Sequence, residues 1–242
     1  MGSELSWYNA VAKPFVTGYQ MVMQGIATET VGENFQRDLL HRARDKTLEL
    51  ILEAAQHIRI GTTEAEAKKL IQDIQGRLGS TKSWHPPQIR FGENSVLPFN
   101  QRGVENPALA ESDIYFLDLG PIFDDHEGDV GRAFTVGNDP EMKRCCADVE
   151  AIWHEVRRHW EETQISGKEL YDFAIARAES RGWKLSLQKA NGHRIADFPH
   201  AAKARGSIEE FQGKPAPDRW ILEIQIRHPT RNFGAFYEDL LH

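Results

Sequence analysis

Three acidic side chains stand inside segments that are otherwise apolar. Asp118 interrupts the run 114–120 (IYFLDLG), Glu223 lies within 220–226 (WILEIQI), and Glu238 lies within 234–241 (GAFYEDLL). Burying a bare carboxylate costs several kcal/mol unless a cation or hydrogen bonds compensate for it. Asp129 follows Asp118 by eleven residues, across an acidic turn, and fifteen residues separate Glu223 from Glu238. Both intervals suit hairpins, so we expect the four carboxylates to approach one another.

Such a cluster of carboxylates favours a metal centre. Four neighbouring negative charges cannot all ionise without compensation, and two divalent ions would balance them. His193 is the best candidate for a neutral ligand, because Gly192 lets the backbone approach closely. Oxygen ligands with one imidazole suit Mn, Fe, Co or Zn. Two such ions would share a water molecule, lower its pKa and polarise a carbonyl group.

The elements that must position these residues follow from periodicity and capping. Apolar residues recur at helical spacing over 38–60, and Thr63 with Glu66 forms a capping box for a second helix that ends at Gly79. Asp139 and Pro140 open a long helix to about residue 162, and Ser166 begins another that stops near residue 182. Strands are expected at 88–91, 114–120, 132–136, 220–226 and 234–241.

The order of helix pair and strands occurs twice, which predicts an α/β (α+β) fold with two similar halves. Residues 1–37 show no sustained period, so we expect an N-terminal arm that serves as a lid or an oligomer contact. Residues 38–242 are expected to form a single catalytic domain.

Composition excludes several classes of protein. The 242 residues carry a formal charge of −7, so nucleic acid and anionic membranes are not expected partners. No apolar run approaches the roughly 18 residues of a membrane span, and the N-terminus lacks a signal-peptide core, which predicts a cytoplasmic protein. Cys145 and Cys146 are the only cysteines, which excludes disulfide scaffolds and cysteine-based zinc sites.

Five of these residues, in order, resemble the ligand set of the pita-bread (creatinase/aminopeptidase) metallopeptidases: Asp118, Asp129, His193, Glu223 and Glu238. This family contains methionine aminopeptidase, aminopeptidase P and prolidase. The resemblance covers residues 38–242 and implies a pita-bread fold, in which a pseudo-twofold antiparallel sheet is covered by two helix pairs. The chain is similar to methionine aminopeptidase in length and to the proline peptidases in the segment FGENSVLP.

The resemblance also implies roles for individual residues. Asp118 would bind one metal, Asp129 and Glu238 would bridge both, and His193 and Glu223 would hold the second. Glu223 would shuttle a proton during catalysis, and His200 would hydrogen-bond the substrate. Arg132 matches a family arginine that would hold a ligand carboxylate by a hydrogen bond.

Two positions depart from the family pattern and bear on the substrate. Phe99 follows Leu-Pro where the family has a histidine, and Lys189 stands where the proline peptidases have another. Both replacements argue against strict proline specificity. Phe99, Lys189 and His85 are therefore the candidate substrate contacts, although surface packing also explains His85.

These observations predict an enzyme with two divalent metal ions. It would hydrolyse an amide bond of a dipeptide, a peptide N-terminus or a peptide-like small molecule through a metal-bridging hydroxide. The alternative is a non-peptidase enzyme of the same fold, such as a lyase, a small amidohydrolase or an iron-dependent oxidative enzyme. A binding module is a further alternative, although it would be expected to have lost ligands. Relatives often form homodimers, so a homodimer is also expected.

Overall fold

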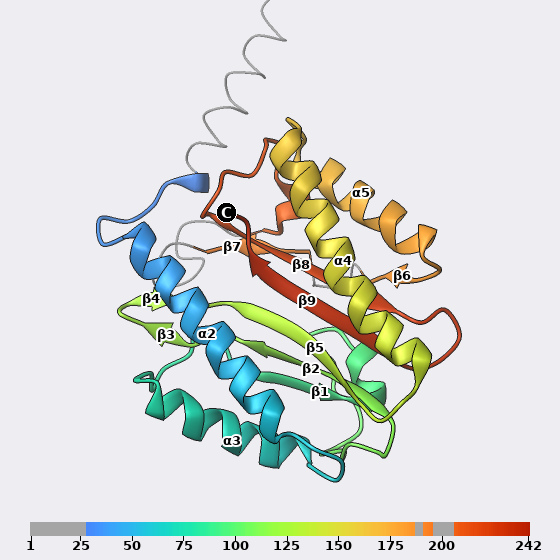
Figure 1. Ribbon diagram of the computed structural model, residues 1–242. Coiled ribbons are helices and arrows are strands. Elements are labelled where there is room, and N and C mark those ends of the chain that lie inside the picture. The colour runs from blue at the N-terminus through green and yellow to red at the C-terminus, as the bar shows by residue number, and fades with distance from the viewer. Residues whose placement is uncertain (1–27, 187–190, 196–205) are drawn as a thin grey trace, which may run out of the picture.

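The computed structural model describes residues 28–186, 191–195 and 206–242. The N-terminal half contains two helices, a 3₁₀ helix, three strands of the main sheet and a small separate hairpin (Figure 1). Their bounds are α2 (Arg37–His57), α3 (Glu64–Arg77), β1 (Gln88–Phe91), η1 (Gly92–Val96), β2 (Asp113–Leu119), β3 (Ile122–Phe123), β4 (His126–Glu127) and β5 (Val130–Val136).

The C-terminal half repeats the order of two helices followed by strands. Its elements are α4 (Pro140–Glu162), α5 (Gly167–Ser180), β6 (Lys184–Leu185), β7 (His193–Arg194), η2 (Ile208–Glu210), β8 (Trp220–Arg227) and β9 (Gly234–Leu240). The expected helices and strands are present. The acidic turn differs from the expectation, because residues 122–127 form a small hairpin of their own, in which β3 pairs with β4.

Helix starts follow the capping signals of the sequence. The hydroxyl of Thr63 accepts a hydrogen bond from the backbone N–H of Glu66, and the carboxylate of Glu66 accepts one from the N–H of Thr63. Ser166 and Glu169 form the same reciprocal pair at the start of α5. Asp139 caps α4, with Pro140 at its first position. These caps satisfy N–H groups that a helix leaves without an internal partner.

One antiparallel sheet joins the two halves. Its strand order is β1-β2-β5-β9-β8-β6, and β7 pairs with β8. The halves meet where β5 pairs with β9, at Gly131 and Glu238. Figure 1 shows α2 and α3 along the half that contains β1, β2 and β5, and α4 and α5 along the half that contains β8 and β9.

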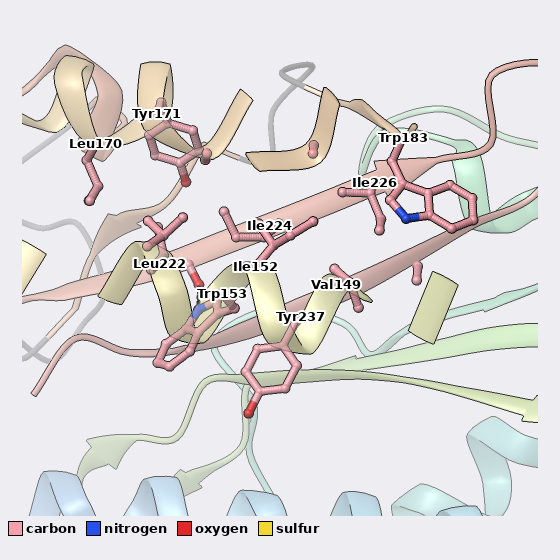
Figure 2. Close-up of a cluster of buried hydrophobic side chains, with 14 of the residues drawn as sticks. Val149, Ile152, Trp153, Leu170, Tyr171, Trp183, Leu222, Ile224, Ile226 and Tyr237 are labelled. Atoms are coloured by element: carbon pink, nitrogen blue, oxygen red, sulfur yellow. Dashed lines mark hydrogen bonds between the residues drawn. The ribbon is translucent and has the colours of Figure 1, made fainter. Parts of the chain in front are cut away.

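Two hydrophobic clusters fix the helices on one face of the sheet. The larger cluster packs α4 and α5 on β8 and β9, and Figure 2 shows its members, among them Ile152, Trp153, Leu222, Ile224 and Tyr237. The indole N–H of Trp153 donates to the carbonyl of Leu222 at 2.9 Å, and the hydroxyl of Tyr171 donates to the carbonyl of Glu223 at 2.9 Å. Both bonds hold the backbone of β8 on either side of the Glu223 side chain.

Alternation along the strands then determines which residues face away from the helices. Successive side chains of a strand point to opposite faces. Because Leu222 and Ile224 of β8 pack on the helices, Glu223 between them points to the other face. Tyr237 of β9 also packs on the helices, so its neighbour Glu238 points to the same face as Glu223. Likewise, Leu117 and Leu119 pack in the second cluster, with α2 and α3, so Asp118 points away from it.

Residues 28–30 lie against the C-terminal half. The guanidinium of Arg194 donates to the carbonyls of Thr28 and Thr30, at 3.0 and 2.9 Å. Glu29 accepts hydrogen bonds from the indole of Trp220 and from the N–H of Ala216. Residues 1–27, most of the expected arm, lie outside the described residues. None of the helices in the described ranges has the length and apolar character needed to cross a bilayer.

Candidate metal centre

The carboxylates are aligned across four neighbouring strands. Asp118 of β2 lies opposite Gly131 of β5, and Gly131 lies opposite Glu238 of β9. Glu238 in turn lies opposite Glu223 of β8. Asp129 comes directly before β5, two residues from Gly131 and therefore on the same face. The two expected hairpins thus place all four carboxylates on the sheet face that the helices leave uncovered.

A glycine at the middle of this row lets its neighbours pack closely. A Cβ atom on Gly131 would lie 2.4 Å from the ring of Phe236 and 2.9 Å from the Cβ atom of Glu238. Real Cβ atoms do not approach other heavy atoms this closely, so any side chain here would displace its neighbours. The absence of a side chain at Gly131 therefore makes room for the Phe236 ring and for Glu238 beside it.

His193 of β7 reaches the same space from the C-terminal half. Its Nε2 atom lies 3.0 Å from Oδ2 of Asp129, 3.5 Å from Oε1 of Glu223 and 3.6 Å from Oε1 of Glu238. The preceding Gly192 has a φ of +66°, and a Cβ atom there would lie 2.4 Å from the carbonyl oxygen of Ile221. The close backbone approach expected of Gly192 is therefore observed.

Burial and mutual repulsion change the acidity of these groups. Burial raises the pKa of Asp118 to about 7, although the nearby imidazole of His85 opposes the rise. The pKa of Glu238 is raised well above its ordinary value by burial and by the charges of Asp129 and Asp118. The pKa of Glu223 is also raised, mainly by burial. The protein alone thus opposes full ionisation of its own cluster.

Asp129 behaves differently because two histidines flank it. Burial would raise its pKa, but contacts with His193 and His85 outweigh burial and lower the pKa to about 2. Burial opposes protonation of both histidines, but the charges of Asp118 and Asp129 raise the pKa of His85 to about 9, and Asp129 raises that of His193 to about 9. Asp129 is therefore the carboxylate that stays ionised at the centre of the cluster.

The donor set fits a divalent cation. Within the described ranges, no hydrogen bond of acceptable geometry reaches either carboxylate oxygen of Asp129 or Oε2 of Glu238, and all three oxygens are buried. Native proteins pair the great majority of such atoms. Two sets of ligand atoms lie within 4.8 Å of one another: one is His85, Asp118 and Asp129, and the other is Asp129, His193 and Glu238. Carboxylate oxygens with imidazole nitrogens match first-row divalent metals.

A cavity of about 260 Å³ opens onto this cluster. Its walls are largely apolar, and they include Leu97, Phe99, Phe116 and Phe236. Phe99 was expected at the substrate site, and its side chain lines this cavity while remaining 51% exposed. Phe116 and Phe236 were not predicted at the site, although each lies two residues before a cluster carboxylate and so shares its face.

The other predicted site residues are placed as follows. His85, for which surface packing was one explanation, is buried beside Asp118 and Asp129. Arg132 donates to the main-chain carbonyl of Glu238 at 2.6 Å and to the carboxylate of Asp239. Arg132 therefore bonds the backbone of Glu238 and not, as predicted, a carboxylate of the cluster, because its side chain lies on the opposite face of the sheet from the cluster. Lys189 and His200 lie outside the described residues.

Comparisons with known proteins agree with this architecture. The profile of metallopeptidase family M24 matches residues 38–241. A search of curated proteins gives no match. Among solved structures, the X-Pro aminopeptidase from Thermotoga maritima is 19% identical, with a TM-score of 0.66, and the match covers 97% of this chain and 66% of that one. The chain thus spans slightly less than two thirds of that enzyme.

Two further structures show the same fold at low identity. The prolidase from Pyrococcus horikoshii is 17% identical, with a TM-score of 0.67, over 96% of this chain and 69% of that one. The methionine aminopeptidase from Thermotoga maritima is 14% identical, with a TM-score of 0.66, over 86% of this chain and 93% of that one. The expected pita-bread fold is confirmed. The chain belongs to metallopeptidase family M24.

Proposed function

We propose that this enzyme uses two divalent metal ions to hydrolyse an amide bond of a dipeptide, a peptide N-terminus or a peptide-like small molecule. The observation that carries the proposal is the row Asp118, Gly131, Glu238 and Glu223 across four strands, with Asp129 and His193 directed at the same space. Four carboxylates in one buried space match the charge of two divalent ions.

The proposed ligands can be assigned to two ions, with Asp129 between them. Asp118 would hold one ion, Glu223 and His193 would hold the other, and Asp129 and Glu238 would contact both. Mn, Fe, Co or Zn suits these donors. When bound, such a pair lowers the pKa of water and polarises a substrate carbonyl.

The side chains of the protein supply proton transfer and orientation. Burial raises the pKa of Glu223, and the backbone N–H of Gly192 donates to its Oε2 atom at 3.3 Å. A carboxyl group with a raised pKa, held in a fixed position, can take a proton from the attacking water and give it to the leaving amine. We assign this role to Glu223, and we assign hydrogen bonding of the substrate carbonyl to His200.

The cavity supports a small substrate with an apolar group. Phe116 and Phe236 pack against each other with ring centroids 5.1 Å apart, on the wall beside the carboxylates. Arg90 donates to the main-chain carbonyls of Phe99 and Gln101, which holds the segment that carries Phe99 at the entrance. Phe99 presents an apolar surface to the cavity, whereas a histidine at this position would offer a proton donor and favour polar substrates. We therefore propose Phe99, together with Lys189, as a substrate contact.

The proposal assigns catalysis to residues 38–242 and a covering or oligomer-forming role to the arm 1–37. The family match over 38–241 supports the first assignment. The contacts of Glu29 with Trp220 and Ala216 support a fixed start for the arm on the catalytic half that carries His193.

Metal analysis with peptide turnover tests the proposal. We expect elemental analysis of the purified protein to give about two metal ions per chain, and added Mn or Co to support release from Met-Ala, Ala-Ala or Xaa-Pro peptides. Asp129→Ala should lose both the metal and the turnover. Asp172→Asn is the matched control, because Asp172 is an exposed carboxylate that pairs only with Lys168 in the described contacts.

The outcomes separate the alternatives. A protein that binds no metal would contradict the proposed centre. Two bound metals without turnover of any peptide would contradict the peptide substrate and would favour a lyase, a small amidohydrolase or an oxidative enzyme of the same fold. Equal metal content in Asp129→Ala and in Asp172→Asn would show that the ions bind elsewhere.

A further inference from the structure

His85 occupies a fixed position beside the carboxylate cluster. It precedes β1, and the chain around it is held to the end of β2: the N–H of Trp84 donates to the carbonyl of Gly120 at 3.0 Å, and Ser83 forms a bridge with Pro121. The His85 side chain is only 7% exposed. His85 lies in a segment without helical or strand periodicity, so its place beside the cluster follows from these tertiary contacts.

The two ring nitrogens of His85 have different surroundings. Nδ1 lies 2.8 Å from the carbonyl oxygen of Pro86, to which it donates. Nε2 is buried and has no hydrogen-bond partner among the described residues. It lies 3.5 Å from Oδ1 of Asp118 and 3.6 Å from Oδ1 of Asp129. Metal-binding histidines typically donate one ring N–H to a carbonyl or carboxylate and direct the other nitrogen at the ion.

These separations are long for a hydrogen bond but close to those of two ligands on one ion. An N–H···O bond places its heavy atoms about 2.7–3.2 Å apart. Two donors that each lie about 2.1 Å from a shared ion are separated by about 3.0–3.4 Å at angles from octahedral to tetrahedral. His85 therefore needs only a small adjustment to share an ion with Asp118 and Asp129.

His193 provides an internal comparison. Its Nδ1 atom also lies near the carbonyl of the next residue, Arg194, at 3.2 Å, and its Nε2 atom faces the cluster. His193 approaches Oδ2 of Asp129, whereas His85 approaches Oδ1. The two histidines thus stand on either side of one carboxylate, and each approaches a different oxygen.

We propose that His85 is a sixth protein ligand of the metal centre and binds, through Nε2, the ion held by Asp118 and Asp129. This inference rests on the dinuclear centre of the proposed function and changes its ligand set. Each ion then has one imidazole, so the two halves of the centre are alike. Imidazole nitrogen shifts preference toward Fe, Co and Zn and away from Mn, which prefers oxygen donors.

Gly120 provides the space for this ring. A Cβ atom on Gly120 would lie 2.4 Å from Nε2 of His85 and 2.3 Å from its Cδ2 atom. Any side chain at position 120 would therefore push the imidazole out of place. The glycine that ends the DLG segment thus makes room for the ring of His85, as Gly131 makes room for the ring of Phe236.

X-ray absorption spectroscopy of the Co-loaded protein tests the proposal directly. Scattering from imidazole rings should correspond to about two rings for two ions in the wild-type protein, and to about one ring in His85→Ala. His85→Ala should also weaken binding of one ion by at least about 10- to 100-fold, the loss usually seen when only the partner of a ligand is removed. His57→Ala, which removes an exposed histidine near the end of α2, should leave the spectrum and the affinity unchanged.

Each result decides between the two proposals. A wild-type spectrum with two ions and a single imidazole would overturn the role of His85 and leave the dinuclear centre intact. This measurement uses the wild-type protein alone, so it does not depend on the folding of a variant. Unchanged metal affinity and spectrum in folded His85→Ala, with or without a loss of turnover, would also overturn it. A wild-type protein that binds no metal would overturn the dinuclear centre and, with it, this inference.

Discussion

Glu238 and Asp239 are neighbours on β9, and both are almost completely buried, yet their surroundings are opposite. Asp239 points to the helix face, where Arg44 donates to both of its oxygens at 2.7 and 2.6 Å and Arg132 also binds it. Burial opposes ionisation, but these arginines lower the pKa of Asp239. Glu238 points to the other face, among Asp118, Asp129 and Glu223, and its pKa is raised.

The difference is that the protein neutralises the charge of Asp239 but not that of Glu238. The protein supplies two cations for Asp239, so this residue joins α2, β5 and β9. It leaves Glu238 among other acids with one oxygen lacking a hydrogen bond in the described part of the chain. A buried charge that the fold does not neutralise points to a ligand that does.

Exchanging each carboxylate for its amide should give the largest and most contrasting effects. Glu238→Gln should reduce turnover by about 10²–10³-fold or more, because the proposed centre loses one of its negative charges. Asp239→Asn should instead lower the free energy of unfolding by about 3–5 kcal/mol, because two arginines lose their partner. Denaturant titrations and turnover per folded molecule measure both effects. The comparison fails if Glu238→Gln retains turnover or if Asp239→Asn affects turnover alone.

The pH dependence of the metal-free protein should show the same contrast. The pKa of Asp118 rises from 3.8 to about 7, so its contribution to stability is lost as pH rises toward 7. The pKa values of His85 and His193 rise from 6.5 to about 9, so their contributions are lost as pH rises through 9. Asp239 has a lowered pKa, so its contribution is lost only as pH falls below about 4.

We therefore expect the chelator-treated protein to lose stability, by a few kcal/mol, between about pH 5 and pH 9. Urea unfolding at a series of pH values measures this slope. Asp118→Asn should flatten it, and Asp239→Asn should leave it unchanged. A stability that rises with pH over this range would contradict the proposed electrostatics.

Added metal should stabilise the folded protein, and this stabilisation should depend on Glu238 but not on Asp239. Ligand at one hundred times its Kd adds about 2.7 kcal/mol to the free energy of unfolding. Thermal unfolding with and without Co or Zn should show this increase for the wild-type protein. Asp239→Asn should respond like the wild type, whereas Glu238→Gln should respond weakly. Equal responses in the two variants would show that the ion binds outside this cluster.

The smallest effect is expected from a methyl group beside Glu238. Gly131→Ala places a carbon 2.4 Å from Phe236, so overpacking should cost about 1–3 kcal/mol and weaken metal binding. Gly76→Ala in α3 meets no atom within 4 Å and should stabilise the protein by about 0.5–1 kcal/mol. Unfolding and metal titrations of both variants test this, and unchanged metal affinity in Gly131→Ala would contradict the spatial role of Gly131.

The sequence was sufficient for the elements and for most of the carboxylates. Caps such as Thr63 and Ser166 mark helix starts by local hydrogen bonds, and Asp118 stood out because its neighbours are apolar. The hairpin spacing then placed Asp129 beside it. These signals involve residues close together in the chain, so they can be recognised without the tertiary structure.

His85 and Asp239 required the tertiary structure. His85 lies in a segment without period, and its position depends on contacts of residues 83 and 84 with residues 120 and 121. The sequence YEDLL does not say which acid meets arginines, because Arg44 is distant in the chain. Alternation could have shown that Arg132, next to Gly131, faces away from the cluster.

Anomalous diffraction from crystals grown with Co²⁺ locates any metal ions in the structure. We expect two anomalous peaks in the space enclosed by Asp118, Asp129, His193, Glu223 and Glu238, both in contact with Asp129, and none beside Asp239. Carboxylates that contact only one another, water or histidine, with no peak among them at saturating Co²⁺, would contradict the proposed metal centre.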